Sequence, residues 1–392
     1  MIVNPKIRGF ICTTAHPTGC AAHVQEQIHY VKQQKKICAP KRILIIGAST
    51  GYGLATRITA AFGANAKTIG VFLEKKATIK RTASAGWYNS VAFKKAAQEA
   101  GLYAKSINGD AFSNEIKQQV IDLIRQDWCS QVDLIIYSLA SPRRYDPIAE
   151  VIYYSVLKPL DKTYFNKTVN ILTGEVSQIE IKAATSKEIF HTEKVMGGED
   201  WALWIEALKN AKVLAKGVST VAYSYIGPEI TYPIYRQGTI GKAKKHLELT
   251  AKSLTKSLAL HCQGNAFISV NKGVVTQASA AIPVVPLYIS LLYKVMKGKG
   301  THEGCIEQIY RLFTKRLFTS EATVPVDEHG RIRMDDWELD KATQSEVKSL
   351  WENVSTDNLE QISDIKGYRK EFFKLFGFKI NNVDYEADLN IL

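Results

Sequence analysis

The chain has 392 residues, of which 46% are hydrophobic, 23% charged and 10% aromatic. So much apolar side chain excludes an intrinsically disordered protein, and at about 150 residues per domain the length predicts two or three domains or one enlarged α/β sheet. The 51 Lys and Arg residues exceed the 38 Asp and Glu residues, which gives a net charge of +13. This charge favours acidic partners, such as phosphorylated cofactors, acidic carrier proteins or nucleic acid, without selecting one of them.

Cysteines and apolar segments predict a cytoplasmic protein. Six cysteines without a C-x-x-C pair are too sparse for a disulfide framework and suit a reducing compartment. The basic residues Lys6 and Arg8 are followed by no apolar stretch of signal-peptide length. The most apolar long stretch, residues 278–293, contains two prolines and is shorter than the roughly 18 residues that span a bilayer. We therefore expect a buried or ligand-facing helix there and no membrane span.

The first half of the chain alternates short apolar runs with helical patterns. Residues 42–46 form an apolar run that ends at a glycine, and residues 53–62 have helical spacing. The same alternation predicts strands at 68–73, 102–107 and 132–138, and helices at 89–100 and 113–126. Solid apolar strands between helices are typical of a parallel sheet that is covered on both faces.

The pattern changes over residues 143–186, where β-branched and alternating segments with a Thr-Gly turn predict an antiparallel insertion. The alternation of helices and strands then returns, with helices predicted at 200–215 and 242–261 and strands at 219–226 and 266–270. The last 90 residues read as amphipathic helices at 303–315, 341–352 and 367–376, with no motif that points to chemistry. We therefore predict an α/β fold, a Rossmann-type doubly wound parallel sheet with an antiparallel β insertion and a helical C-terminal cap. Its expected parts are an N-terminal extension (1–40), a catalytic domain (41–300) and the cap (301–392), integrated into one structural unit.

A glycine-rich turn lies between the first strand and the first helix of this series. It consists of Gly47, Ala48, Ser49, Thr50, Gly51, Tyr52 and Gly53. At such a position, backbone N–H groups of the helix N-terminus can bind a pyrophosphate, and glycines let the chain approach it. Any glycine turn can show this spacing, but the strand before it and the helix after it favour a dinucleotide site.

The acidic residue that ends the second strand bears on which dinucleotide binds. Glu74 comes 21 residues after Gly53, close to the ~20 expected for the acid that accepts hydrogen bonds from the adenosine ribose and repels a 2′-phosphate. We therefore expect NADH to be preferred over NADPH. Lys75 and Lys76 follow at once and could instead stabilise that phosphate, or form a solvated charged turn.

Three polar residues at and after the C-terminal end of the strand predicted at 219–226 are candidates for catalysis. Tyr225 ends that strand, and Tyr235 and Lys244 follow, nine residues apart. On one continuous helix they would point in opposite directions, because each residue turns by ~100°. Gly238 and Gly241 disfavour helix before about residue 240, which places Tyr235 on a loop and Lys244 in the first turns of the next helix, free to converge. A nearby ammonium group would favour the ionised form of the Tyr235 phenol and make it a better proton donor.

With these motifs the chain resembles the FabV-type enoyl-acyl-carrier-protein reductases and the similar trans-2-enoyl-CoA reductases, enlarged members of the short-chain dehydrogenase superfamily. The resemblance covers essentially the whole chain. It is carried by RGFICTTAHPTGC (8–20), the glycine turn (47–53), GWYN (86–89), SINGDAF (106–112), YSLA (137–140), MGGEDW (196–201), the Tyr235-x8-Lys244 pair, VTQAS (275–279) and THEGCIEQ (301–308).

The resemblance implies roles for individual residues. Tyr235 would be the proton donor, Tyr225 would contact the substrate, and Lys244 would hold the nicotinamide ribose. Further residues would line the cofactor site, namely Leu73, Glu74, Asp110, Ala111, Leu139, Ala140, Val274, Val275 and Thr276. Lys245 could assist Lys244 or be a solvated helix lysine.

The implied reaction is the NADH-dependent reduction of trans-2-enoyl thioesters, the final reductive step of fatty acid elongation. Hydride would reach the β-carbon, and the Tyr235 hydroxyl would stabilise the charge that develops on the thioester oxygen. The expected substrates are thioesters of coenzyme A or acyl carrier protein, with no nucleic acid partner, and the resemblance favours a monomer. The alternative is a dinucleotide sensor or nucleic-acid-binding protein without catalysis, against which Tyr225, Tyr235 and Lys244 argue together.

Other motifs have simpler interpretations. The set Cys12, His16, Cys20 and His23 offers zinc-type ligands, but its spacing is not that of familiar zinc fingers, and we expect no metal. His302, Glu303 and Cys305 could be drawn as a catalytic triad, although a helix start after Gly300 explains them as well. Residues 283–293 are either ordinary core or, as the resemblance implies, the cover of the acyl pocket.

Overall fold

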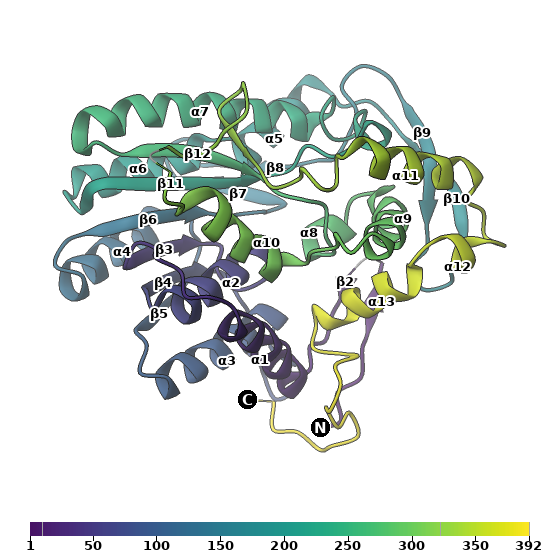
Figure 1. Cartoon of the computed structure of the whole chain (residues 1–392), viewed down its shortest axis with the longest axis horizontal. Coiled ribbons are helices and arrows are strands. Elements are labelled where there is room, and N and C mark those ends of the chain that lie inside the picture. The colour runs from purple at the N-terminus through teal and green to yellow at the C-terminus, as the bar shows by residue number, and fades with distance from the viewer. Residues whose placement is uncertain (10, 322, 392) are drawn as a thin grey trace.

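A seven-stranded sheet forms the centre of the computed structural model, which describes residues 1–9, 11–321 and 323–391 (Figure 1). Its strands are β3 (Arg42–Ile46), β4 (Lys67–Phe72), β5 (Ala104–Asn108), β6 (Val132–Tyr137), β11 (Leu214–Ser224), β12 (Asn265–Val270) and β13 (Arg331–Arg333). They lie in the order β13-β12-β11-β6-β3-β4-β5, and every neighbouring pair is parallel. The order reverses between β3 and β6, so the carboxyl ends of these strands flank the crevice in which such sheets bind ligands. The predicted Rossmann-type sheet is confirmed.

Alternating apolar residues of the strands face two helical layers. In β3, Ile43 and Ile45 join a cluster with α1, α2, α3 and α10, whereas Leu44 and Ile46 join a cluster with α4, α6 and α7. The bounds of these helices are α1 (Pro17–Gln33), α2 (Gly51–Ile58), α3 (Ala85–Glu99), α4 (Asn114–Asp127), α6 (Glu199–Asn210), α7 (Thr239–Cys262) and α10 (Cys305–Leu312). All four apolar residues of β3 are fully buried, which explains why the strand reads as an unbroken apolar run.

The insertion consists of two antiparallel hairpins, as predicted. Strand β7 (Arg143–Asp146) pairs with β8 (Val151–Tyr154), and β9 (Tyr164–Val169) pairs with β10 (Val176–Ile181). Helix α5 (Ser186–Met196) follows and was not predicted, although Thr185 and Glu188 form the capping box that marks its start.

The predicted helix at 200–215 was wrong at its C-terminal end. Helix α6 ends at Asn210, and β11 begins at Leu214. Between them, Lys212 has a φ of 58°, a left-handed conformation that ends a helix.

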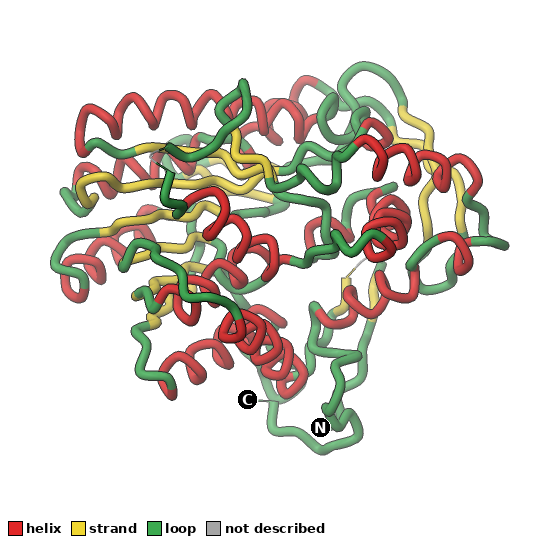
Figure 2. Tube along the Cα trace, in the orientation of Figure 1, coloured by secondary structure: helices red, strands yellow, loops and turns green. Residues whose placement is uncertain are grey.

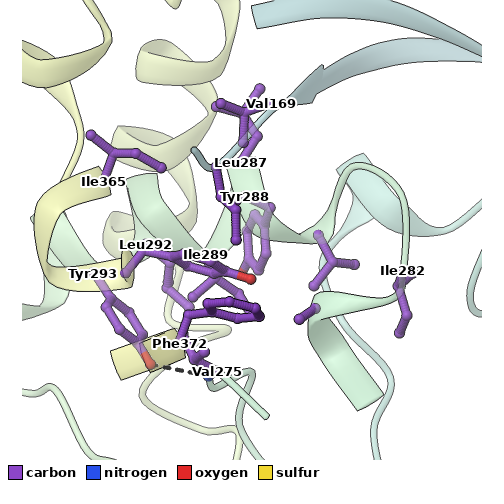
Figure 3. Packing of buried hydrophobic residues seen from close by; sticks show 14 of the residues in the cluster. Val169, Val275, Ile282, Leu287, Tyr288, Ile289, Leu292, Tyr293, Ile365 and Phe372 are labelled. Carbon is purple, nitrogen blue, oxygen red and sulfur yellow. Dashed lines mark hydrogen bonds between the residues drawn. The ribbon is translucent and has the colours of Figure 1, made fainter. Parts of the chain in front are cut away.

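A third core cluster surrounds α9 (Val285–Gly298), which follows the short helix α8 (Gln277–Ala280). Figure 3 shows part of this cluster, with Leu287, Tyr288, Ile289, Leu292 and Tyr293 on α9 close to Val275, Ile365 and Phe372. Residues on all sides of α9 are buried, as expected of a helix that is apolar all round. The helix predicted at 278–293 is thus divided into α8 and α9, of which α9 is buried as predicted. Among the described residues no helix has the length and apolar character needed to cross a membrane.

The two ends of the chain lie side by side at one end of the molecule (Figures 1 and 2). The N-terminal hairpin β1 (Ile7–Arg8) and β2 (Ile11–Cys12) precedes α1, and the amide of His16 donates to the carbonyl of Phe376 at 2.9 Å. The C-terminal segment contains α10, the π-helical turn η3 (Phe313–Leu317), α11 (Lys341–Asn353), α12 (Leu359–Ile362) and α13 (Ile365–Lys374). It also supplies β13 to the edge of the main sheet, an element that the predicted helical cap did not include. The division at residues 40 and 300 stays a prediction.

Candidate active site

Close backbone packing shapes the glycine turn between β3 and α2. Gly47 has a φ of 92°, and a Cβ placed on Gly53 would lie 1.8 Å from the carbonyl oxygen of Gly47. The side chain of the N-cap residue, Thr50, makes no hydrogen bond to the first turn of α2, and that turn holds no acidic residue. The N–H groups at this helix N-terminus are therefore available to an anion, which fits the pyrophosphate of a dinucleotide.

Glu74 lies directly after β4, beside this turn. Its carboxylate accepts a hydrogen bond of 2.6 Å from the Ser49 hydroxyl, and its backbone exchanges two hydrogen bonds with the Asn108 side chain. A Cβ on Gly86 would lie 2.0 Å from the Glu74 carboxylate, so a side chain there would displace this carboxylate. The ammonium group of Lys76 lies 5.2 Å from the centre of the Trp87 ring. This arrangement holds the Glu74 carboxylate beside the glycine turn.

The other predicted cofactor residues follow the carboxyl ends of neighbouring strands. Leu73 comes after β4 and is 69% exposed. The pair Asp110 and Ala111 follows β5, the pair Leu139 and Ala140 follows β6, and the segment Val274, Val275 and Thr276 follows β12. The methyl group of Thr276 lies 3.6 Å from the position of a Cβ on Gly51. The segment 274–276 therefore lies against the glycine turn, and all these residues lie at the carboxyl ends of the parallel strands.

A cavity of about 640 Å³ brings the predicted catalytic residues together. Tyr225, Tyr235 and Lys244 line it. It is also lined by the cofactor residues Tyr52, Leu139, Ala140, Val274 and Thr276. Tyr235 and Lys244, for which convergence was predicted, thus line one cavity together with Tyr225, whereas Lys245 is exposed and does not line it.

The two tyrosines meet edge to face. Their ring centres are 5.0 Å apart with an angle of 78° between the planes. The Tyr225 hydroxyl donates to a carboxylate oxygen of Glu338 at 2.9 Å, whereas the Tyr235 hydroxyl makes no hydrogen bond within the described part of the chain. Burial, and to a smaller extent the charge of Glu338, raises the pKa of Tyr235. The expectation that Lys244 would lower this pKa is therefore wrong, and the phenol stays protonated at neutral pH.

Lys244 lies in α7 and Tyr235 on the preceding loop, as the glycines predicted. A Cβ on Gly241 would lie 1.9 Å from the carbonyl oxygen of Arg236, so a side chain at 241 would prevent the close turn that leads into α7. Lys244 is half-buried in the cavity wall, and burial lowers its pKa to about 8. Its ammonium group is therefore still mostly charged at neutral pH.

Part of the cavity wall is apolar. Ile282, Val285 and Ile289 line it from the α9 side, opposite Leu157 of the insertion and Met196 at the end of α5. Figure 3 shows Ile282 on the loop before α9 and Ile289 on the helix. Side chains of this kind suit an acyl chain, which supports the interpretation of residues 283–293 as a pocket cover as well as core.

Sequence reasoning missed one residue of the site, Glu338. It lies between β13 and α11, in the segment for which no chemistry was predicted, and its side chain is fully buried. Its carboxylate accepts hydrogen bonds from the hydroxyls of Tyr225 and Tyr288 and from the amide of Gly273. Only its acidic side chain could have pointed to it, and that segment holds several acids.

The remaining motifs have structural roles. His16 is the N-cap of α1 and accepts from the amide of Gly19, and Cys12 donates to the carbonyl of Thr14. No group of His, Cys, Asp or Glu residues that could hold a metal is found within residues 1–9, 11–321 and 323–391.

The residues drawn as a triad do not form one. Glu303 pairs with Arg311, and α10 begins at Cys305. His302 and Cys305 line a second cavity of about 270 Å³ beside Thr50 and Gly51.

Comparisons with known proteins agree with this geometry. Residues 81–318 match the family model of the trans-2-enoyl-CoA reductase catalytic region, and residues 2–79 match the NAD(P)H binding domain of trans-2-enoyl-CoA reductase. The chain belongs to this enoyl reductase family. It is 63% identical to the enoyl-[acyl-carrier-protein] reductase [NADH] of Coxiella burnetii over 392 residues, which cover 100% of this chain and 96% of the relative. It is 58% identical to the protein of the same name from Cytophaga hutchinsonii, with 100% and 98% covered.

A solved member of the family has the same fold. The structure of Treponema denticola trans-2-enoyl-CoA reductase in complex with NAD is 51% identical and superposes with a TM-score of 0.96, covering 99% of this chain and 98% of that one. The predicted family, fold class and enzymatic class are confirmed.

A third family model, described as an enoyl reductase FAD binding domain, matches residues 326–389. The described residues of this segment form β13 and the helices α11, α12 and α13. Between β13 and α11 they contain no glycine turn of the kind that follows β3. The residues present do not fit a flavin dinucleotide, and no step of the reaction is assigned to one.

Proposed function

We propose that this chain uses NADH to reduce the carbon–carbon double bond of trans-2-enoyl thioesters, with Tyr235 as the proton donor. The observation that carries the proposal is the shared cavity, in which Tyr225, Tyr235 and Lys244 lie beside the segment that packs on the glycine turn. The saturated acyl thioester is the product expected of the last reductive step in fatty acid elongation. A dinucleotide sensor or nucleic-acid-binding protein would not need these three side chains around an apolar chamber.

The residues present fit NADH. The glycine turn offers N–H groups for the pyrophosphate, Glu74 offers a carboxylate for the adenosine ribose, and Lys244 offers an ammonium group for the nicotinamide ribose. When bound, NADH supplies the hydride that the β-carbon of the substrate accepts. The carboxylate of Glu74 supports a preference for NADH over NADPH, because it would repel a 2′-phosphate.

Tyr235 is suited to the proton transfer. Its hydroxyl is free to donate, and burial raises its pKa, so the phenol is protonated when negative charge develops on the thioester oxygen. Donation from a buried site to this oxygen stabilises the enolate, because the surrounding apolar walls strengthen the interaction. Protonation of the α-carbon, directly or by tautomerisation of the enol, then gives the saturated thioester.

The carrier of the acyl group is either coenzyme A or acyl carrier protein. The net charge of +13 suits the phosphates of the one and the acidic surface of the other. A comparison of kcat/KM for both kinds of thioester with acyl chains from C4 to C12 would separate them. Monomeric state and cytoplasmic location stay predictions.

The variant Tyr235→Phe tests the proposal. It removes only the hydroxyl, so we expect loss of crotonyl-CoA-dependent NADH oxidation by at least about 100-fold, the scale of general acid catalysis, with NADH binding largely unchanged in a fluorescence titration. Tyr232→Phe is the matched control, because Tyr232 lies on the same loop and does not line the cavity. Wild-type turnover by Tyr235→Phe would remove the proposed donor.

A further inference from the structure

A buried carboxylate lies behind the two active-site tyrosines, on a segment remote from them in sequence. Glu338 is 0% exposed, and among the described residues no cation lies within ion-pair distance of it. Lys272 is nearby, but its ammonium group donates to the carbonyl oxygens of Gly273 and Glu303 instead. Burying a carboxylate without an ion pair costs free energy unless hydrogen bonds compensate.

Three donors surround the Glu338 carboxylate. One oxygen accepts from the hydroxyls of Tyr225 at 2.9 Å and Tyr288 at 2.7 Å, and the other accepts from the amide of Gly273 at 2.6 Å. A Cβ on Gly273 would lie 3.0 Å from the Tyr225 hydroxyl and 3.2 Å from the carboxylate, so the absence of a side chain there leaves room for this contact. The donors come from the end of β11, the loop after β12 and α9.

The hydrogen bond between Tyr225 and Glu338 determines where the hydroxyl proton of Tyr225 is donated. A phenol has one proton, and that of Tyr225 is donated to Glu338. Tyr225 is therefore held with its ring edge-on to Tyr235, and Tyr235 is left as the phenol that can donate into the cavity.

We propose that Glu338 is a positioning residue for the reduction: its carboxylate fixes the Tyr225 hydroxyl as a donor and thereby holds the ring of Tyr225 against the proton donor Tyr235. This inference rests on the proposed function, in which Tyr235 donates the proton. It assigns the C-terminal segment a part in the reaction that neither its helices nor its motifs indicate.

The variant Glu338→Gln tests this role with little change of shape. The amide of Gly273 needs an acceptor, so the glutamine oxygen would take that side and its NH₂ group would face the two phenols. The NH₂ group is a donor, so the hydrogen bond to Tyr225 would reverse. We expect kcat for crotonyl-CoA to fall about tenfold to 100-fold, the range for losing a hydrogen bond to a charged group, with the KM for NADH changed by less than about twofold.

A double-mutant cycle with Tyr225→Phe separates positioning from support of the fold. If Glu338 acts through Tyr225, Glu338→Gln should lower kcat by less than about twofold in the Tyr225→Phe background. An equal loss in both backgrounds, or a loss confined to NADH affinity through Gly273, would overturn the proposal. Glu338→Asp, whose shorter side chain withdraws the carboxylate from the phenols, is measured alongside. Wild-type kcat in folded Glu338→Gln or in folded Glu338→Asp would also overturn the proposal.

Asp335→Asn is the matched control. Asp335 is equally buried on the same segment, but both of its oxygens accept from Arg333, whereas Glu338 accepts from the two tyrosines. We expect this variant to lower Tm and to keep the wild-type kcat. Tyr235→Phe, assayed in parallel, distinguishes the two proposals: wild-type turnover in that variant refutes Tyr235 as the proton donor, on which the role of Glu338 rests, whereas its inactivity together with a fully active Glu338→Gln refutes only the role of Glu338.

Discussion

The close contact between Gly47 and Gly53, the two ends of the glycine turn, leads to a specific prediction for Gly53→Ala. The new methyl group would lie 1.8 Å from the carbonyl oxygen of Gly47, where real Cβ contacts stay beyond 3.0 Å. The first turn of α2 must therefore move away from β3 by about 1.2 Å. This turn carries the N–H groups that we assign to the pyrophosphate, so the substitution displaces these binding groups and Tyr52 of the cavity wall, while Tyr225, Tyr235 and Lys244 lie on other elements.

A displacement of this size is large for a binding site. Misplacement by ~1 Å costs on the order of 100-fold in rate, and overpacking a tight contact costs about 1–3 kcal/mol of stability. For Gly53→Ala we expect at least about a 100-fold loss of kcat/KM for NADH at fixed crotonyl-CoA, with weaker NADH binding in a fluorescence titration. The protein should still fold, with a lower Tm.

Gly298→Ala is the control for this experiment, because the chemical change is the same. A Cβ on Gly298, the last residue of α9, meets no atom within 4 Å. Replacing a helical glycine by alanine gains up to about 0.5–1 kcal/mol, so we expect unchanged kinetics and a Tm that is equal or slightly higher. NADH affinity at the wild-type level in Gly53→Ala would refute the assignment of the glycine turn.

Three further predictions concern charges. Lys117→Met should lower the free energy of unfolding by about 3–5 kcal/mol in a denaturant titration, because it leaves Asp200, its buried partner at 2.8 Å, without a cation. Burial lowers the pKa of Lys244 to about 8, so the ammonium form is lost as the pH rises through that value. We therefore expect kcat/KM for NADH to fall above about pH 8. A Lys244→Arg variant that binds NADH should lack this fall, since arginine stays charged. Glu74→Gln should raise kcat/KM for NADPH relative to NADH by about tenfold or more, since it removes the charge that repels a 2′-phosphate; an unchanged ratio would count against Glu74 as the selecting residue.

The parts of the fold that were predictable are those with strong local patterns. Strand β3 is found with the predicted bounds because all its apolar residues are buried on both faces of the sheet. The break between Tyr235 and Lys244 was predictable because glycines mark the change from loop to helix. Strand β13 was not, since a three-residue strand with a single apolar residue, Ile332, shows no periodicity.

The environment of the proton donor was also beyond prediction from the sequence. Glu338 lies 113 residues after Tyr225 and 50 after Tyr288, and nothing local distinguishes it from neighbouring acids such as Asp336. Its burial depends on how the segment after β13 packs on α9. The burial of Tyr235 itself, and to a smaller extent the charge of Glu338, raise the pKa of Tyr235, a direction opposite to the one that the nearby lysine suggested.

The C-terminal segment is therefore support for the active site as well as cover for the sheet. Helix α9 forms one wall of the acyl cavity, and its other sides pack on α11 and α13. The amide of Asp364 donates to the carbonyl of Ser290 in α9, and its carboxylate pairs with Lys297. Glu338 joins the same helix to the end of β11 through Tyr288 and Tyr225. Because the wall of the chamber and the tyrosine beside the proton donor depend on this segment, we expect substitutions at Glu338 and in α11 to change kcat for the acyl substrate more than the Kd for NADH.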